Sequence, residues 1–185
     1  MVATFNSPYF DQVLAYWQSV AREGVPSVSA FDLIQIPAAL PDITFWEMYP
    51  DGRVICRMVG TAVMARMKSD ITGVELSAVM PSSTEFNLVD DLRALFSQPC
   101  ALFQVLVNRH VTGKTARMET LTLPLSADKG GNPKLVTVNH MLETVKYGDD
   151  QQSGTLELMR TIEDHRFIDL GFGIPTVKNA QQTAS

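Results

Sequence analysis

Near the start of the chain, hydrophobic residues recur at steps of three and four, which is the period of an amphipathic helix. The run begins after Ser7-Pro8, a typical helix N-terminus, and stops at Gly24 and Pro26. It predicts a helix over residues 8–23 whose apolar stripe must lie on this domain or on a partner. The stripe consists of Phe10, Val13, Leu14, Trp17, Val20 and Ala21.

Further along, two aromatic and β-branched segments predict a hairpin over residues 43–49 and 54–59, with Pro50-Asp51-Gly52 as its turn. A short helix follows at 60–67 and a longer amphipathic helix at 85–97. Three more strands are predicted at 102–111, 116–125 and 135–145. This order of elements indicates an α+β fold with a five-stranded antiparallel sheet.

Changes in composition suggest where the domain begins and ends. From Tyr147 to Thr155 the chain is polar and contains glycine, as a linker does, and its last ten residues are predicted to be disordered. We therefore expect a cap helix at 1–26, a single domain at 27–146, and a linker with a C-terminal tail at 147–185.

The composition excludes several functional classes. With 45% hydrophobic and 19% charged residues among 185, the chain is not disordered throughout. A net charge of −5 without a basic patch argues against binding nucleic acid or anionic lipid. No run approaches the roughly 20 apolar residues that cross a bilayer, the first seven residues do not look like a secretory signal, and two cysteines make no disulfide framework. We expect a soluble, cytoplasmic protein.

Catalytic and metal motifs are not evident in the sequence. The three histidines lack ligand spacing, so no metal site is predicted, and Cys56 and Cys100 lie in apolar stretches outside any catalytic motif. His165 belongs to a charged run and is predicted on a solvated face. His140 lies inside a predicted strand, where it is either a satisfied core histidine or a polar group facing a cavity.

Methionines accompany aromatic residues through much of the chain, and such flexible side chains fill irregular cores or line adaptable apolar cavities. The methionines concerned are Met48, Met58, Met64, Met67, Met80, Met118 and Met141.

The order of elements resembles a PAS domain, and short motifs narrow the resemblance to a bacterial group of largely single-domain PAS proteins. The similarity covers about residues 9–145, with Lys68-Ser69 departing from a usual glycine. The motifs are Leu14-Ala15-Tyr16-Trp17, Leu40-Pro41, Arg57-Met58-Val59-Gly60-Thr61, Asp70-Ile71-Thr72-Gly73 and the strand from Glu119 to Leu125.

The resemblance implies a PAS-like five-stranded antiparallel sheet around a cavity, with short helices on one face and the N-terminal amphipathic helix on the other. It implies a sensory or interaction module that is not an enzyme and whose output passes through a signalling protein partner. Haem and flavin are disfavoured. Haem-binding relatives carry a histidine on the longer helix, and residues 85–97 contain none. Flavin photosensors carry a cysteine in Asn-Cys-Arg-Phe, and this chain lacks that motif. An unknown small organic ligand remains open.

By analogy with PAS folds, strand alternation sorts the side chains onto two faces. Leu121, Leu123 and Leu125 point outward and need cover, because burying a leucine contributes roughly 1.5–3 kcal/mol. The cover is Phe10, Leu14 and Trp17, from the same chain or across a homodimer, and an Arg57–Glu119 pair is predicted on the same face. The ligand-binding residues are predicted to be Trp46, Met48, Cys56, Met58, Phe96, Met118, Thr120 and Thr122, joined by His140 or its neighbour Asn139 depending on register.

Three functions follow from these expectations. The first is a signalling module that binds a small apolar ligand, a protein partner or both. The second is a small α+β-cavity enzyme, lyase- or isomerase-like, which would need a carboxylate beside His140 inside the cavity. The third is a scaffold whose core is filled by side chains.

Overall fold

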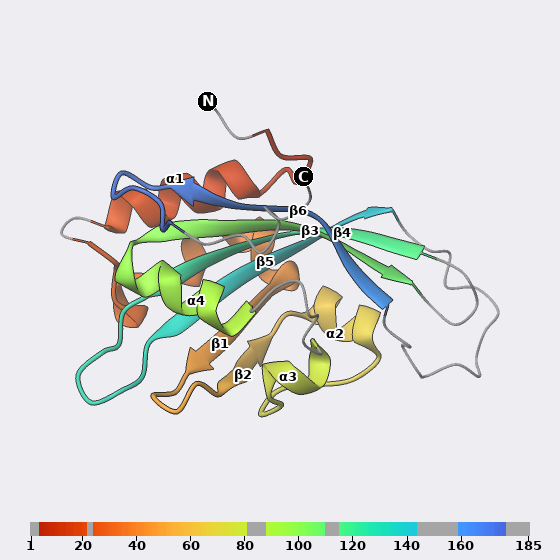
Figure 1. Ribbon diagram of the computed structural model, residues 1–185, viewed down its shortest axis with the longest axis horizontal. Coiled ribbons are helices and arrows are strands. Elements are labelled where there is room, and N and C mark those ends of the chain that lie inside the picture. The colour runs from red at the N-terminus through yellow and green to blue at the C-terminus, as the bar shows by residue number, and fades with distance from the viewer. Residues whose placement is uncertain (1–3, 22–23, 81–87, 110–114, 144–158, 177–185) are drawn as a thin grey trace, which may run out of the picture.

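One six-stranded antiparallel sheet organises the protein (Figure 1). The computed structural model describes residues 4–21, 24–80, 88–109, 115–143 and 159–176. The strand order is β2-β1-β5-β4-β3-β6, which confirms the antiparallel α+β architecture. The strands are β1 (Ile43–Met48), β2 (Val54–Val59), β3 (Cys100–Arg109), β4 (Thr115–Leu125), β5 (Lys134–Glu143) and β6 (Met159–Asp169).

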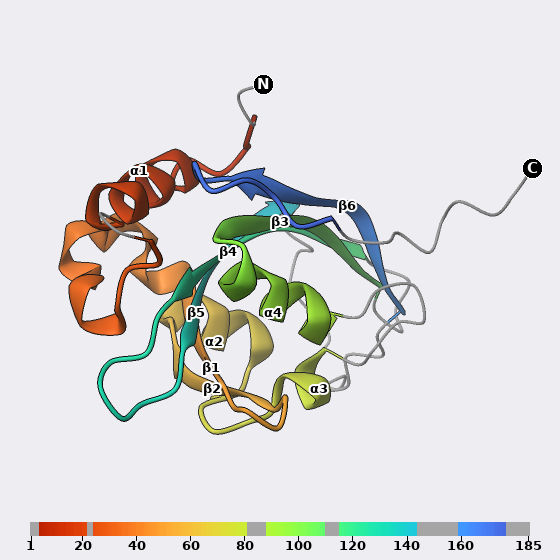
Figure 2. The same cartoon turned by 60° about the vertical axis from the view of Figure 1, so that its left-hand side comes forward.

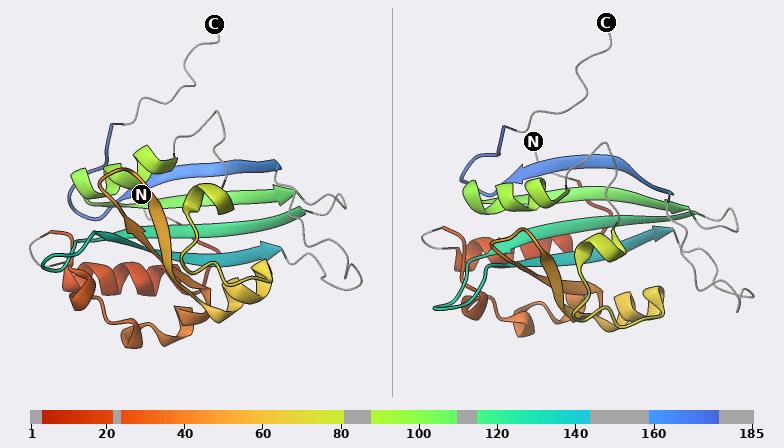
Figure 3. Two further views of the ribbon diagram at one scale, coloured as in Figure 1. Left: turned by 90° about the horizontal axis from the view of Figure 1, so that it is seen from below. Right: turned by 60° about the horizontal axis from the view of Figure 1, so that its bottom comes forward.

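Helices cover both faces of this sheet. Figure 2 shows α1 (Phe10–Val20) on the outer face and the other α-helices inside the curve of the sheet. The inner helices are α2 (Thr61–Met67), α3 (Leu76–Val79) and α4 (Leu88–Ser97). Three 3₁₀ turns, η1 (Val28–Ala30), η2 (Leu33–Gln35) and η3 (Pro37–Asp42), connect α1 to β1. The β1–β2 hairpin crosses the direction of β3, β4 and β6, so the sheet is strongly curled (Figure 3).

The sixth strand was not predicted. Residues 159–169, which the sequence placed in the linker and tail, pair along the whole of β3 and extend the sheet at that edge. Charged residues such as Glu163, Asp164 and Arg166 hide the alternation, and an edge strand tolerates them because one side of it faces water. The division at residues 26 and 27 stays a prediction.

On the outer face, α1 of the same chain covers the leucines of β4. Leu121, Leu123 and Leu125 are fully buried together with Phe10 and Trp17. Trp17 Nε1 also donates a hydrogen bond of 2.8 Å to a β4 carbonyl, which ties the helix to the strand. Phe10 and Trp17 therefore offer no surface to a second copy, whereas Leu14 is half-buried.

The predicted Arg57–Glu119 pair is not formed, because β1 and β5 separate the strands that carry the two residues. Glu119 is buried and accepts hydrogen bonds from the backbone amides of Asn6 and Ser7 and from the Asn6 side chain. Arg57 instead pairs with Glu47, at 2.5 Å. Glu119 thus holds the segment that leads into α1.

Candidate functional site

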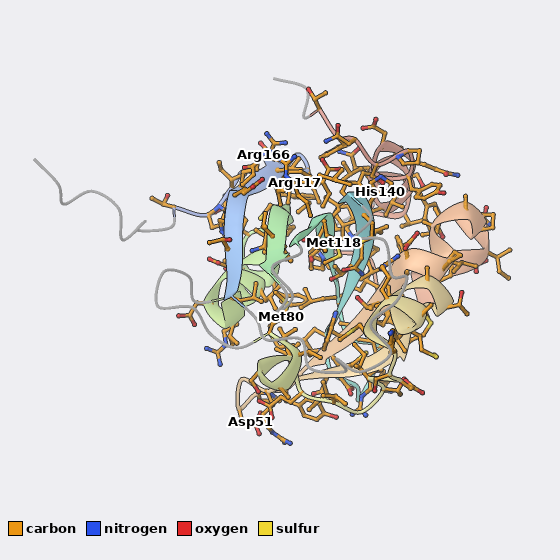
Figure 4. All side chains as sticks on the ribbon, turned by 90° about the vertical axis from the view of Figure 1, so that its right-hand side faces the viewer. Asp51, Met80, Arg117, Met118, His140 and Arg166 are labelled. Carbon is orange, nitrogen blue, oxygen red and sulfur yellow. The ribbon has the colours of Figure 1, made fainter. Side chains whose placement is uncertain are left out.

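A cavity of about 150 Å³ lies between the concave face of the sheet and the three inner helices. Its walls combine apolar side chains from α2, α3 and α4 with side chains from β1, β3, β4 and β5. In Figure 4, Met118 lies on the strand side and Met80 on the helix side, and both residues line the cavity.

Four of the nine predicted ligand-binding residues line this cavity: Trp46, Met118, Thr120 and Thr122. Met48 and Cys56 are buried beside the cavity in the inner core, the cluster of buried side chains that also includes Leu95 and Leu102. Phe96 packs against this core but does not line the cavity. Strand alternation placed Met48 and Cys56 on the correct face, but it could not show how far each lies from the cavity.

Met58 faces outward, contrary to the prediction, because a β-bulge interrupts the hairpin. Phe45 pairs with Met58, but the next residue of β1, Trp46, pairs with Cys56, so β2 carries one extra residue at Arg57. An extra residue reverses alternation beyond it. Met58 consequently packs against the outer core with Phe45, while Cys56 stays inside.

His140 is also outside the cavity, and the register explains why. Glu119 pairs with His140 and Thr120 with Asn139, so Asn139 faces inward and His140 outward. The His140 ring makes an edge contact with Tyr9, at 6.4 Å between ring centroids, toward α1 (Figure 4). An enzyme built on His140 inside the cavity does not fit this placement.

A row of three buried polar side chains crosses the cavity wall. Gln104 of β3 pairs with Thr120 of β4, which pairs with Asn139 of β5, and all three line the cavity with no more than 9% exposure. Asn139 uses its amide NH₂ to donate to the Asp42 carbonyl at 3.0 Å. The Gln104 NH₂ contacts His165 Nδ1 at 3.1 Å.

The oxygens of this polar row have no hydrogen-bond partner among the residues that the structure describes. They are Thr120 Oγ1, Gln104 Oε1 and Asn139 Oδ1. A buried polar atom without a partner costs about 1–3 kcal/mol, so such atoms usually meet water or a ligand. The next row contrasts with it: Thr122 and Thr137 share a hydrogen bond of 2.9 Å, and Trp46 donates to Thr44 at 3.0 Å.

The one cation lining the cavity within the described ranges is neutralised. Arg66 of α2 pairs with Asp42 at 2.6 Å, and it also donates to the Asn139 carbonyl at 3.4 Å. Because that charge is already compensated and the free polar atoms are oxygens, the cavity favours an uncharged ligand that carries hydrogen-bond donors.

His165 and Asp91 form a buried pair behind Gln104, which the sequence did not predict. The His165 side chain is 12% exposed and that of Asp91 is 8% exposed, with 3.4 Å between Nε2 and Oδ2, so His165 is not on a solvated face. Burial lowers the pKa of His165, against the opposing effect of the Asp91 carboxylate, and burial raises the pKa of Asp91. The sequence contains an indication of this burial. His165 and Phe167 are two residues apart on one strand, so they face the same side of the sheet, and Phe167 packs against the inner core.

The two thiols are free and buried, and burial raises the pKa of both, that of Cys100 to about 12. They are therefore protonated at neutral pH and do not act as nucleophiles. Within the part of the chain that the structure describes, no group of three or more histidine, cysteine or carboxylate side chains could hold a metal ion, and no helix is long and apolar enough to cross a membrane.

Comparison with known proteins identifies the family. The sequence pattern of the PAS domain matches residues 5–138, and the chain belongs to this family, whose members are typically sensory or signalling modules. No curated protein matches the chain. Similar solved structures include the LOV protein of Rhodobacter sphaeroides, 13% identical with a TM-score of 0.40 over 78% of this chain and 72% of that chain. Another is the PAS domain of an HTR-like protein from Haloarcula marismortui, 17% identical with a TM-score of 0.36 over 56% and 92%.

Proposed function

We propose that this protein is a cytoplasmic PAS sensor that binds a small, uncharged, largely apolar ligand in the cavity and signals through a partner protein. The observation that carries the proposal is the row of buried oxygens on Gln104, Thr120 and Asn139, which lack protein partners among the described residues. A core filled only by side chains would leave these atoms unsatisfied at a cost of several kcal/mol in total, about 1–3 kcal/mol each.

Size and wall chemistry support a ring-shaped ligand. A cavity of about 150 Å³ is large enough for an aromatic ring. Met67, Met80, Met118 and Met141 line it and can adapt to the outline of a ligand. Trp46, Thr120 and Thr122 remain the predicted contacts, and we expect neither haem nor a flavin adduct.

We expect such a sensor to pass its signal to a partner through α1. Thr120 faces the cavity, whereas its neighbours on β4, Glu119 and Leu121, hold the N-terminal segment and support α1. A ligand that shifts β4 therefore changes the population of docked α1, and a signalling partner can read that change. Association of two copies through α1, where Leu14 is half-buried, stays a prediction.

Thermal unfolding with small bicyclic probes tests ligand binding. Indole carries one donor, indanone carries one acceptor, and indane carries neither. A probe present at ten times its Kd stabilises the protein by about 1.4 kcal/mol, which raises the Tm by about 3–6 °C. Ala116→Phe places a ring at the cavity wall and should abolish this shift, while the same change at exposed Ala127 should preserve it.

Two results together would overturn the proposal and favour a scaffold whose core is filled by side chains. None of the probes would raise the Tm of the wild type, and Ala116→Phe would destabilise the protein by about 1–3 kcal/mol, as overpacking of a full core does. A cavity predicts instead that Ala116→Phe leaves the free energy of unfolding unchanged or raises it.

A further inference from the structure

Gln104 joins the ligand cavity to the buried pair of His165 and Asp91. We propose that the protonation state of His165 decides which end of the Gln104 amide faces the cavity, so that the site selects hydrogen-bond donors when His165 is neutral and acceptors when it is charged. This inference rests on the proposed function, since it concerns recognition of the same ligand.

In the neutral state, the geometry fixes the hydrogen-bond directions. A neutral imidazole has one donor and one acceptor nitrogen. Nε2 lies 3.4 Å from the Asp91 carboxylate, which only accepts when it is ionised, so the ring proton faces the ionised Asp91 on Nε2. Nδ1 then accepts from the Gln104 NH₂ at 3.1 Å, and Gln104 Oε1 is left for the cavity. A ligand must supply an N–H or O–H to that oxygen.

Protonation of the ring reverses this arrangement. Both nitrogens of the imidazolium donate, so Nδ1–H faces the Gln104 NH₂ as donor against donor. Rotation of the amide by half a turn restores the hydrogen bond by bringing Oε1 to the ring. The NH₂ then faces the cavity. Because the two ends of the amide are nearly equal in size, the cavity keeps its shape while its hydrogen-bonding character changes.

The groups around the ring set the pH at which this happens. Asp91 reaches the ring from α4 and Gln104 from β3, while Asp164 and Phe167 flank it on β6. Asp91 and Asp164 favour the charged ring, but burial outweighs them and lowers the pKa of His165. His165 is therefore neutral near pH 7, and the acceptor-selecting state belongs to acidic conditions.

The charged groups nearby are themselves paired. Asp90, beside Asp91, contacts Arg93 at 3.2 Å, and Asp164 contacts Arg166 at 3.7 Å. Linkage makes the effect reciprocal: a ligand that donates to Gln104 holds His165 neutral and lowers its pKa further, whereas an acceptor ligand raises it.

The test measures indole and indanone affinity from about pH 8 to about pH 5, with indane as the reference, by NMR of the methionine methyl groups that line the cavity. None of the three probes titrates in this range. One hydrogen bond is worth about fivefold in affinity, so the preference for indole over indanone should fall about 20-fold or more on acidification. Indane affinity should stay constant.

Three variants separate this mechanism from a general pH effect. Gln104→Met keeps the side-chain length without an amide, and His165→Gln removes the titrating ring, so both should give a preference that does not change with pH. His140→Gln is the matched control on the outer face, and it should retain the full change. The wild-type profile and the ring ¹⁵N shifts of His165 keep the test decisive even if a variant does not fold.

The outcomes distinguish the two proposals. If the probes bind but their preference is independent of pH in the wild type, or if neutral His165 carries its proton on Nδ1, the switch is refuted and ligand binding stands. If no probe binds at any pH, the ligand-binding proposal fails together with the switch.

Discussion

Replacing Glu119 with glutamine should release the N-terminal segment from the sheet. Glu119 is 2% exposed, and its carboxylate accepts hydrogen bonds from three N–H groups. They are the Asn6 amide at 3.1 Å, the Asn6 side chain at 2.6 Å and the Ser7 amide at 3.0 Å. Glutamine keeps one acceptor oxygen and turns the other into a donor, so at least one N–H faces an NH₂ group.

The size of the effect follows from these contacts. A hydrogen bond to a charged group contributes about 1.5–3 kcal/mol, and a buried donor without a partner costs about 1–3 kcal/mol. We therefore expect Glu119→Gln to lower the free energy of unfolding by about 2–4 kcal/mol. Against a typical total of 5–15 kcal/mol this is a large share, and it should lower the Tm by about 5–15 °C.

Urea unfolding measures the global loss, and hydrogen exchange of the α1 amides shows whether the helix undocks locally. Glu163→Gln is the matched control, because Glu163 lies on a strand in an exposed pair with Arg117 and should cost at most about 1 kcal/mol. If Glu119→Gln is no more destabilising than Glu163→Gln, or if α1 exchange is unchanged, the anchoring role of Glu119 is wrong.

Three further predictions follow from single contacts. A Cβ on Gly60 would lie 2.4 Å from a backbone carbonyl oxygen, so Gly60→Ala should cost about 2–3 kcal/mol in urea unfolding. Gly131→Ala, where the nearest atom is 3.5 Å away, should stay within about 0.5 kcal/mol, and equal losses would contradict the clash. Cys56 and Cys100 should resist a thiol-specific disulfide reagent at pH 8 until urea is added, and rapid labelling of native protein would contradict their burial. Trp17→Phe removes one buried hydrogen bond and should cost about 1–3 kcal/mol by thermal unfolding, whereas an unchanged Tm would show that this bond adds nothing.

Local patterns were sufficient for most of the architecture. The β1–β2 hairpin and α2 form at the residues where aromatic, β-branched and turn residues predicted them. The leucines of β4 also required a cover, and α1 supplies it. By contrast, β6 was missed because its inward-facing residues include His165, whose partners Asp91 and Gln104 lie far away in sequence.

The candidate site was predicted only in part, because it depends on register and on bulges. Thr120 and Thr122 follow from alternation along one strand and were placed correctly in the cavity. Whether Asn139 or His140 joins them depends on how β5 pairs with β4, which a single strand does not encode. Met58 moved to the outer face because the bulge at Arg57 reverses the alternation there.

The two faces of β4 cannot respond independently of each other. Glu119 and Leu121 face outward while Thr120 between them faces the cavity, so one backbone carries the anchor of the N-terminal segment and the centre of the polar row. A ligand that satisfies Thr120 therefore restrains the strand to which α1 is docked. The β1–β2 hairpin, in contrast, contributes Trp46 and Thr44, whose polar atoms already bond to each other. We therefore expect ligand occupancy to change hydrogen exchange in α1 more than in β2.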